Sequence, residues 1–146
     1  MVHKNGVTII ELLVVVGIIS LLTIVSLPLL LSYQKTTKLK NEALNLAINL
    51  RLAQQLAVTE QVIYNVKIFP AEKKYQIINS GSGVVRKEVI LDQEISSITT
   101  SELTDNTARF NATGGAVESG SITLINTRNN SSAVQIKPSG YVEVTN

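Results

Sequence analysis

The order of apolar and polar residues divides the chain into an uncharged apolar run, a stretch of helical periodicity and a stretch of alternating residues. Residues 12–31 include no charged side chain, and 15 of these 20 positions are Leu, Val or Ile. Twenty helical residues rise about 30 Å, which is the thickness of the hydrocarbon core of a bilayer. The run therefore predicts a helix that spans a membrane.

An ordinary secretory signal peptide is the first alternative for an apolar run so near the N-terminus. Such a peptide has a shorter apolar core, and a small-x-small cleavage site follows it. Residues 29–34 offer no convincing pair of small residues, and the acidic Glu11 stands at the entrance of the run. We therefore expect the apolar segment to be retained.

Residues 35–60 contain no Gly or Pro and continue the predicted helix. Their apolar side chains fall on two lines of the helix surface. The first line is Leu39, Ala43, Leu46, Leu50, Ala53 and Ala57, and the second is Leu44, Ile48, Leu52 and Leu56. Two apolar lines on one helix predict that the helix packs against two partners. Either the helix is buried between two parts of its own domain, or one line packs on its sheet and the other faces a neighbouring subunit.

Beyond Gln61 the chain changes to β-branched and aromatic residues interrupted by turn formers. Residues 62–69 and 75–78 flank a turn and predict a hairpin. Further strands are predicted at residues 84–91, 108–111, 121–125, 133–137 and 141–144. The predicted fold class is α+β, with a long N-terminal helix packed through its second half on a C-terminal antiparallel β domain.

Composition leaves little material for catalysis. The 146 residues include no cysteine and one histidine, His3, which precedes the apolar run. The glutamates after the helix are scattered, so no paired carboxylates and no nucleophile with a neighbouring base are apparent. Asp92 and Glu94, two apart in a predicted loop, fit a solvated turn better than a cation site. We expect no enzymatic activity, no cofactor and no metal site.

The distribution of charge does not indicate a general nucleic-acid-binding surface. From Glu102 onward the chain has three basic against four acidic side chains, so the phosphate attraction that dominates such binding is small. The pattern leaves room for one interaction of this kind, a local DNA contact by Arg128, which stands beside Asn129 and Asn130 in a loop.

Glu11 is the residue whose position most needs a physical explanation, because its carboxylate stands at the start of the apolar run. A carboxylate at the centre of a bilayer costs about 2.5 to 3.5 kcal/mol, so an acid at the start of a spanning helix needs a partner or a route to the headgroups. One interpretation is that the side chain reaches the lipid headgroups. The other is that a positive group neutralises it.

Residues 4–19, KNGVTIIELLVVVGII, resemble the N-terminal signature of type IV prepilins and pseudopilins. The resemblance implies cleavage between Gly6 and Val7 by a prepilin peptidase on the cytoplasmic side. It also implies methylation of the new amine of Val7, where the family commonly has phenylalanine. Glu11 would neutralise the N-terminal amine of an adjacent subunit in a filament, and Pro28 would kink the helix.

The rest of the chain narrows the resemblance to the FimT/GspH class of minor pseudopilins, which is pilin-like in fold, and to the related competence pseudopilin of Gram-positive bacteria. Residues 53–57, residues 73–76 and the closing pattern of residues 108–144 carry this similarity, although Tyr141 stands where members commonly have arginine. The implied function is a subunit of a type II secretion or type IV pilus-like filament that drives protein secretion or DNA uptake. The implied partners are other pilins or pseudopilins, an inner-membrane assembly platform and membrane lipid. The alternative is a single-span membrane-anchored binding protein that does not polymerise.

These expectations divide the chain into a leader (1–6), a membrane and filament-core helix (7–34), an amphipathic half-helix (35–61) and a β domain (62–146). One conflict concerns orientation. Lys35, Lys38 and Lys40 outnumber Lys4, so the positive-inside rule would place the β domain in the cytoplasm. The resemblance implies a cytoplasmic N-terminus in the bacterial inner membrane and a periplasmic or extracellular β domain, and we follow it because the peptidase site requires a cytoplasmic leader.

Overall fold

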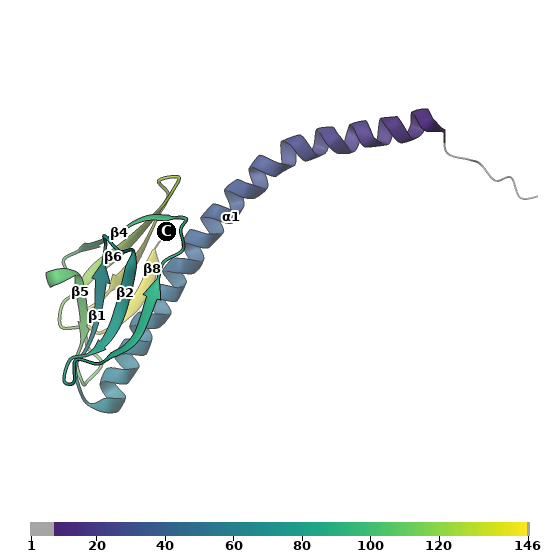
Figure 1. Ribbon diagram of the computed structural model, residues 1–146. Helices are drawn as coiled ribbons and strands as arrows, with labels where there is room; N and C mark the ends of the chain where they lie inside the picture. The colour runs from purple at the N-terminus through teal and green to yellow at the C-terminus, as the bar shows by residue number, and fades with distance from the viewer. Residues whose placement is uncertain (1–7, 146) are drawn as a thin grey trace, which may run out of the picture. The chain divides into compact units, whose positions relative to one another are not determined.

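The computed structural model describes residues 8–145, apart from the side chains of residues 27–29, 31 and 32. Within these residues, the helix α1 (Ile9–Glu60) is followed by eight strands and a short 3-10 helix (Figure 1). The chain forms two compact units, Met1–Gln34 and Lys35–Asn146.

In the N-terminal unit, the apolar side chains of α1 are exposed. The segment Ile9–Ser26 is long and apolar enough to cross a membrane, and no part of it is buried. Its large aliphatic side chains, from Ile9 to Val25, are between 50% and 82% exposed. Water would solvate such a surface poorly, so the segment is suited to lipid or to other apolar helices.

In the second unit, two four-stranded antiparallel sheets are formed. Sheet A has the order β3 (Val85–Ile90), β2 (Lys74–Asn79), β1 (Tyr64–Phe69) and β5 (Thr107–Phe110). Sheet B has the order β4 (Ile95–Ser101), β6 (Gly120–Asn126), β7 (Ser131–Ile136) and β8 (Val142–Thr145). The 3-10 helix η1 (Thr104–Asn106) precedes β5. The antiparallel β domain that the sequence predicts is thus divided into two sheets.

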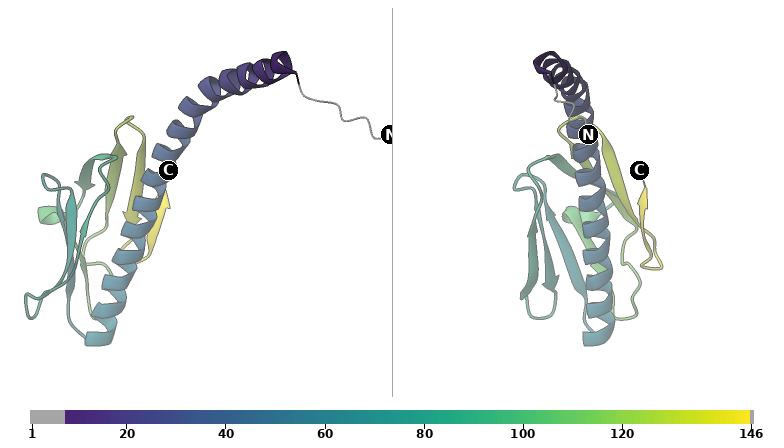
Figure 2. Two further views of the ribbon diagram at one scale, coloured as in Figure 1. Left: turned by 45° about the vertical axis from the view of Figure 1, so that its right-hand side comes forward. Right: turned by 90° about the vertical axis from the view of Figure 1, so that its right-hand side faces the viewer.

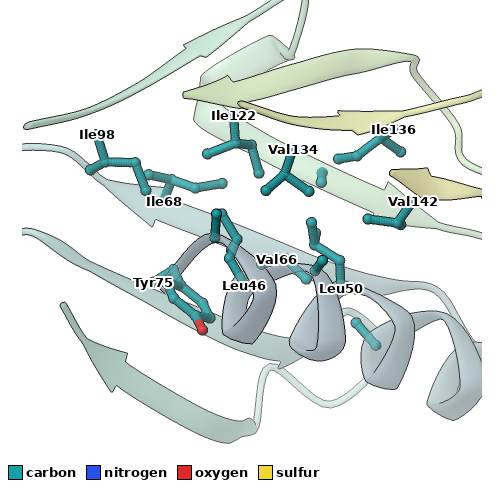
Figure 3. Close-up of a cluster of buried hydrophobic side chains, with 14 of the residues drawn as sticks. Leu46, Leu50, Val66, Ile68, Tyr75, Ile98, Ile122, Val134, Ile136 and Val142 are labelled. Carbon is teal, nitrogen blue, oxygen red and sulfur yellow. The ribbon is translucent and has the colours of Figure 1, made fainter. Parts of the chain in front are cut away.

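The core lies between the two sheets and the part of α1 that belongs to this unit (Figure 2). Leu46 and Leu50 of α1 point into it and meet side chains of both sheets (Figure 3). The strands contribute alternate residues, because successive side chains of a strand point to opposite faces. These core residues include Val66, Ile68, Tyr75, Ile98, Ile122, Val134, Ile136 and Val142.

The two apolar lines of α1 have different environments. Every residue of the first line, from Leu39 to Ala57, is buried in the core. In the second line Leu52 and Leu56 pack partly against the core, whereas Leu44 is 43% exposed and Ile48 is 58% exposed. The helix is therefore not buried between two parts of its own domain, and its outer face carries aliphatic side chains in solvent.

One strand, β4, is absent from the sequence-based prediction. Its sequence, ISSITTS, buries only Ile95 and Ile98, which are three residues apart. A register shift between Ile95 and Ser97 in the pairing with β6 indicates a bulge there. The bulge inserts one residue, which hides the period of two that identifies a strand.

Candidate functional site

The helix α1 begins at a hydroxyl cap beside Glu11. The backbone N–H of Glu11 donates to Oγ1 of Thr8 at 3.3 Å, and the N–H of Leu12 donates to the carbonyl oxygen of Thr8 at 3.2 Å. A Thr followed three residues later by Glu is the sequence of a capping box. The carboxylate of Glu11 is exposed in the first helical turn, where the helix dipole favours a negative charge.

Two polar side chains within the apolar segment, Ser20 and Thr23, donate hydrogen bonds to the backbone of their own helix. Ser20 Oγ donates to the carbonyl oxygen of Val16 at 2.8 Å, and Thr23 Oγ1 donates to that of Ile19 at 2.8 Å. These hydroxyls therefore do not add unpaired donors to the surface of a segment that lipid would surround.

The other residues of the predicted N-terminal site are Gly6, Val7 and Pro28. Gly6 and Val7, the proposed cleavage and methylation positions, lie outside the described residues. The backbone of Pro28 belongs to α1, but its side chain is not described, so the kink stays a prediction.

Lys35, the first lysine after the apolar run, is held by the β domain. Its Nζ lies 3.1 Å from Oε2 of Glu94 and donates to Oγ1 of Thr127 at 3.3 Å. Thr127 Oγ1 in turn donates to Oε2 of Glu94 at 2.9 Å. This hydroxyl and the ammonium group of Lys35 lower the pKa of Glu94.

Lys38 makes a second ion pair of the same kind, one helical turn further on. Its Nζ lies 3.3 Å from Oδ2 of Asp92. The N–H of Glu94 donates to Oδ1 of Asp92 at 2.8 Å, and this bond, with the charge of Lys38, lowers the pKa of Asp92. Nearby, burial raises the pKa of Glu42, and the charge of Asp92 raises it further. The turn that carries Asp92 and Glu94 therefore binds the ammonium groups of two lysines. Among the described residues, no group of three side chains could together ligate a metal ion.

Near the C-terminal end of α1, a hydrogen bond fastens the loop at Gly114 to the helix, and the loop at Gly140 packs against this bond. Gln54 Nε2 donates to the carbonyl oxygen of Gly114 at 2.6 Å. Gly140, with φ +80°, approaches both groups so closely that a Cβ atom there would collide with them. Gln61, also with positive φ, ends the helix, and its Nε2 donates to the carbonyl oxygen of Val58 at 2.7 Å.

Charges in the C-terminal strands are largely paired locally. Arg109 Nη1 lies 3.1 Å from Oε1 of Glu118, and Lys137 Nζ lies 3.0 Å from Oε2 of Glu143. Arg128 is exposed in the β6–β7 turn, where its N–H donates to Oδ1 of Asn126. These pairs reduce the positive charge that is open to a phosphate backbone.

Sequence reasoning found Glu11 but missed Thr8 as its capping partner, although the spacing from Thr8 to Glu11 is that of a capping box. It also noted Asp92 and Glu94 without their lysine partners. Those pairs join residues more than 50 positions apart, and no local pattern identifies them.

A long helix with an exposed apolar first part and a second part packed on antiparallel sheets defines a pilin-like subunit. The family model described as type II transport protein GspH matches residues 42–140. The chain therefore belongs to this family of minor pseudopilins, as the sequence pattern predicts, and it is a subunit of a pilus or pseudopilus.

Solved structures show the same fold. The type IV minor pilin FimU of Pseudomonas aeruginosa strain PAO1 is 16% identical, with a TM-score of 0.62 over 78% of this chain and 92% of that chain. The minor pseudopilin EpsH from the Type 2 Secretion System of Vibrio cholerae is 11% identical, with a TM-score of 0.61 over 74% of this chain and 96% of that chain. None of the curated protein sequences matches the chain.

Proposed function

We propose that the protein is inserted as a single-span precursor, is cleaved after Gly6, and is assembled through its N-terminal helix into a filament that drives protein secretion or DNA uptake. The observation that carries this proposal is the segment Ile9–Ser26, of which no part is buried and whose first turn carries the carboxylate of Glu11. The prepilin peptidase, the inner-membrane assembly platform and membrane lipid are the further partners. The N-terminus would be cytoplasmic and the β domain would lie outside the membrane.

In the assembled filament, Glu11 would neutralise the N-terminal amine that cleavage creates on Val7 of an adjacent subunit. An ion pair between these groups is strong where apolar helices exclude water, because the dielectric constant there is low. An unpaired carboxylate in the same place carries a large desolvation cost. The pair would therefore select subunits that are both cleaved and correctly placed along the filament axis.

The Glu11→Ala variant tests this role. We expect cleavage to proceed as in the wild type, as measured by mass spectrometry of the N-terminus, and the filament fraction to fall at least about tenfold because an amine is left unpaired. Glu72→Ala, an exposed acid in the β1–β2 turn, is the matched control and should assemble normally. Normal filament assembly by Glu11→Ala would contradict the role proposed for Glu11.

The same experiment separates the filament subunit from a membrane-anchored binding protein. If residues 1–6 are retained in cells with an active prepilin peptidase, and no filament forms, the chain acts as a single-span binding protein. The gene can also be deleted in its host, with protein secretion and DNA uptake measured in parallel. The process that is lost identifies the system to which the filament belongs.

A further inference from the structure

Two of the three lysines that follow the apolar run are paired with one acidic turn. Lys35 pairs with Glu94, and Lys38 pairs with Asp92. Lys35 is four residues beyond Leu31, so the chain between them spans at most about 14 Å. When residues 12–31 occupy a bilayer, these ammonium groups lie close to the headgroup region, whatever the orientation of the β domain.

The acidic turn is rigidly built. The N–H of Ile95 donates to the carbonyl oxygen of Asp92 at 2.9 Å, and the N–H of Thr127 donates to the carbonyl oxygen of Glu94 at 3.0 Å. The bonds to the two side chains, described above, hold both carboxylates toward the helix. Both are ionised at neutral pH, because their pKa values are lowered.

An unpaired lysine at this depth would hold the domain to the membrane. Each Lys or Arg near an anionic bilayer surface strengthens binding by about fivefold. Such attraction suits a permanent anchor, but it opposes the departure of a subunit that must pass from lipid into a filament.

We propose that Asp92 and Glu94 occupy the ammonium groups of Lys38 and Lys35 and so withhold them from anionic lipid headgroups, which allows the folded subunit to leave the bilayer surface. The inference rests on the proposed function, since only an assembling subunit has to leave the membrane.

Two variants separate this role from simple stabilisation of the domain. Asp92→Asn with Glu94→Gln removes the carboxylates and frees both lysines. Adding Lys35→Gln and Lys38→Gln to these two changes also removes both ion pairs but leaves no free lysine. The matched control is Glu143→Gln, which frees Lys137 from an ion pair of 3.0 Å; Lys137 follows β7 at the opposite end of that strand from the β6–β7 turn, which carries Thr127.

The first measurement is made on the full chain in vesicles of phosphatidylcholine alone or mixed with phosphatidylglycerol. Acetylation rates of the individual lysines are followed by mass spectrometry. In the wild type, Lys35 and Lys38 should react equally fast in both lipids. In the double variant their reaction should slow about fivefold in the anionic vesicles, because lipid phosphate now protects them. Lipid-dependent rates in the wild type, or lipid-independent rates in the double variant, would overturn the proposal.

The second measurement is the fraction of the chain in filaments in the host. The double variant should fall at least about fivefold, and the fourfold variant and Glu143→Gln should match the wild type. A fourfold variant as poor as the double variant would show that the ion pairs act only through the fold, and the proposal would fail. If the wild type forms no filament, the proposed function fails, and the acetylation rates still decide whether the carboxylates shield the lysines.

Discussion

At the residue scale, Gly140 is the glycine at which an added Cβ atom would make the closest contacts. Its φ of +80° lies in the region that L-residues avoid, and a Cβ atom there would collide with the Gly114 carbonyl and the Gln54 amide. A side chain there would break the hydrogen bond that fastens the Gly114 loop to α1. Sequence reasoning marks this glycine as a turn former, but only the structure shows the close approach.

We expect Gly140→Ala to lower the free energy of unfolding by at least about 2 kcal/mol, because backbone strain and a collision with backbone atoms act together. Urea unfolding of the detergent-solubilised chain, followed by tyrosine fluorescence, measures this change. Gly83→Ala is the matched control: its φ is +69° but nothing lies within 4 Å of a Cβ there, so about 1 kcal/mol of strain is expected. Equal losses in both variants would show that the close approach at Gly140 is unimportant.

The buried side chain of Tyr75 makes the stability of the β domain depend on pH. Burial raises its pKa to about 12, while a hydrogen bond from Asn49 Nδ2 at 2.8 Å opposes the increase. Between pH 10 and 12 the folded protein keeps a proton that the unfolded chain has lost, so the stability should fall as the pH rises. In Tyr75→Phe this part of the alkaline loss should vanish, as urea unfolding at several pH values would show. An unchanged alkaline slope would assign the loss to other groups.

At the element scale, α1 shows what the sequence could and could not determine. The spacing of its first apolar line predicts the buried face correctly, because a period of 3.6 residues depends only on helix geometry. It left the second line ambiguous, since apolar spacing does not say whether a partner belongs to the same chain. The division of the strands into two sheets was equally inaccessible, because pairing partners such as β1 and β5 are distant in sequence.

The exposed aliphatic residues Leu44 and Ile48 predict that the outer face of α1 contacts another subunit. Ile48→Lys should change the free energy of unfolding by less than about 0.5 kcal/mol, because the side chain is in solvent. It should lower the filament fraction at least about tenfold, because the contact would bury an unpaired charge. Thr99→Lys, which places a lysine at an exposed position of β4, is the control. Filaments of Ile48→Lys at the wild-type level would leave this face without a partner.

At the scale of the whole molecule, the core belongs to one unit and most of the exposed large aliphatic side chains belong to the other. Among the described residues, every buried side chain lies at Leu39 or beyond, so the second unit does not need the first in order to bury its core. None of the described side chains of the N-terminal unit is buried. The two units therefore meet different physical requirements within one chain.

Removal of residues 1–34 should leave a monomer that is soluble in water and unfolds in one cooperative transition. Size-exclusion chromatography and thermal unfolding of residues 35–146 measure this, and the full chain should require detergent or lipid. Aggregation of the shortened chain, or gradual loss of its structure, would show that the apolar segment contributes to the fold.

The internal bonds of Ser20 and Thr23 have a consequence for how the apolar segments would recognise one another. A hydroxyl that already donates to its own backbone has no second proton to donate to a neighbouring helix, so these two side chains do not direct helix–helix contacts as donors. Close approach of another helix then depends on the small residues of the segment, such as Gly17, where nothing lies within 4 Å of a Cβ atom. We therefore expect the register between neighbouring apolar segments to depend on packing at these small residues, on the charge of Glu11 and on the folded domain, rather than on hydrogen bonds donated by the two hydroxyls.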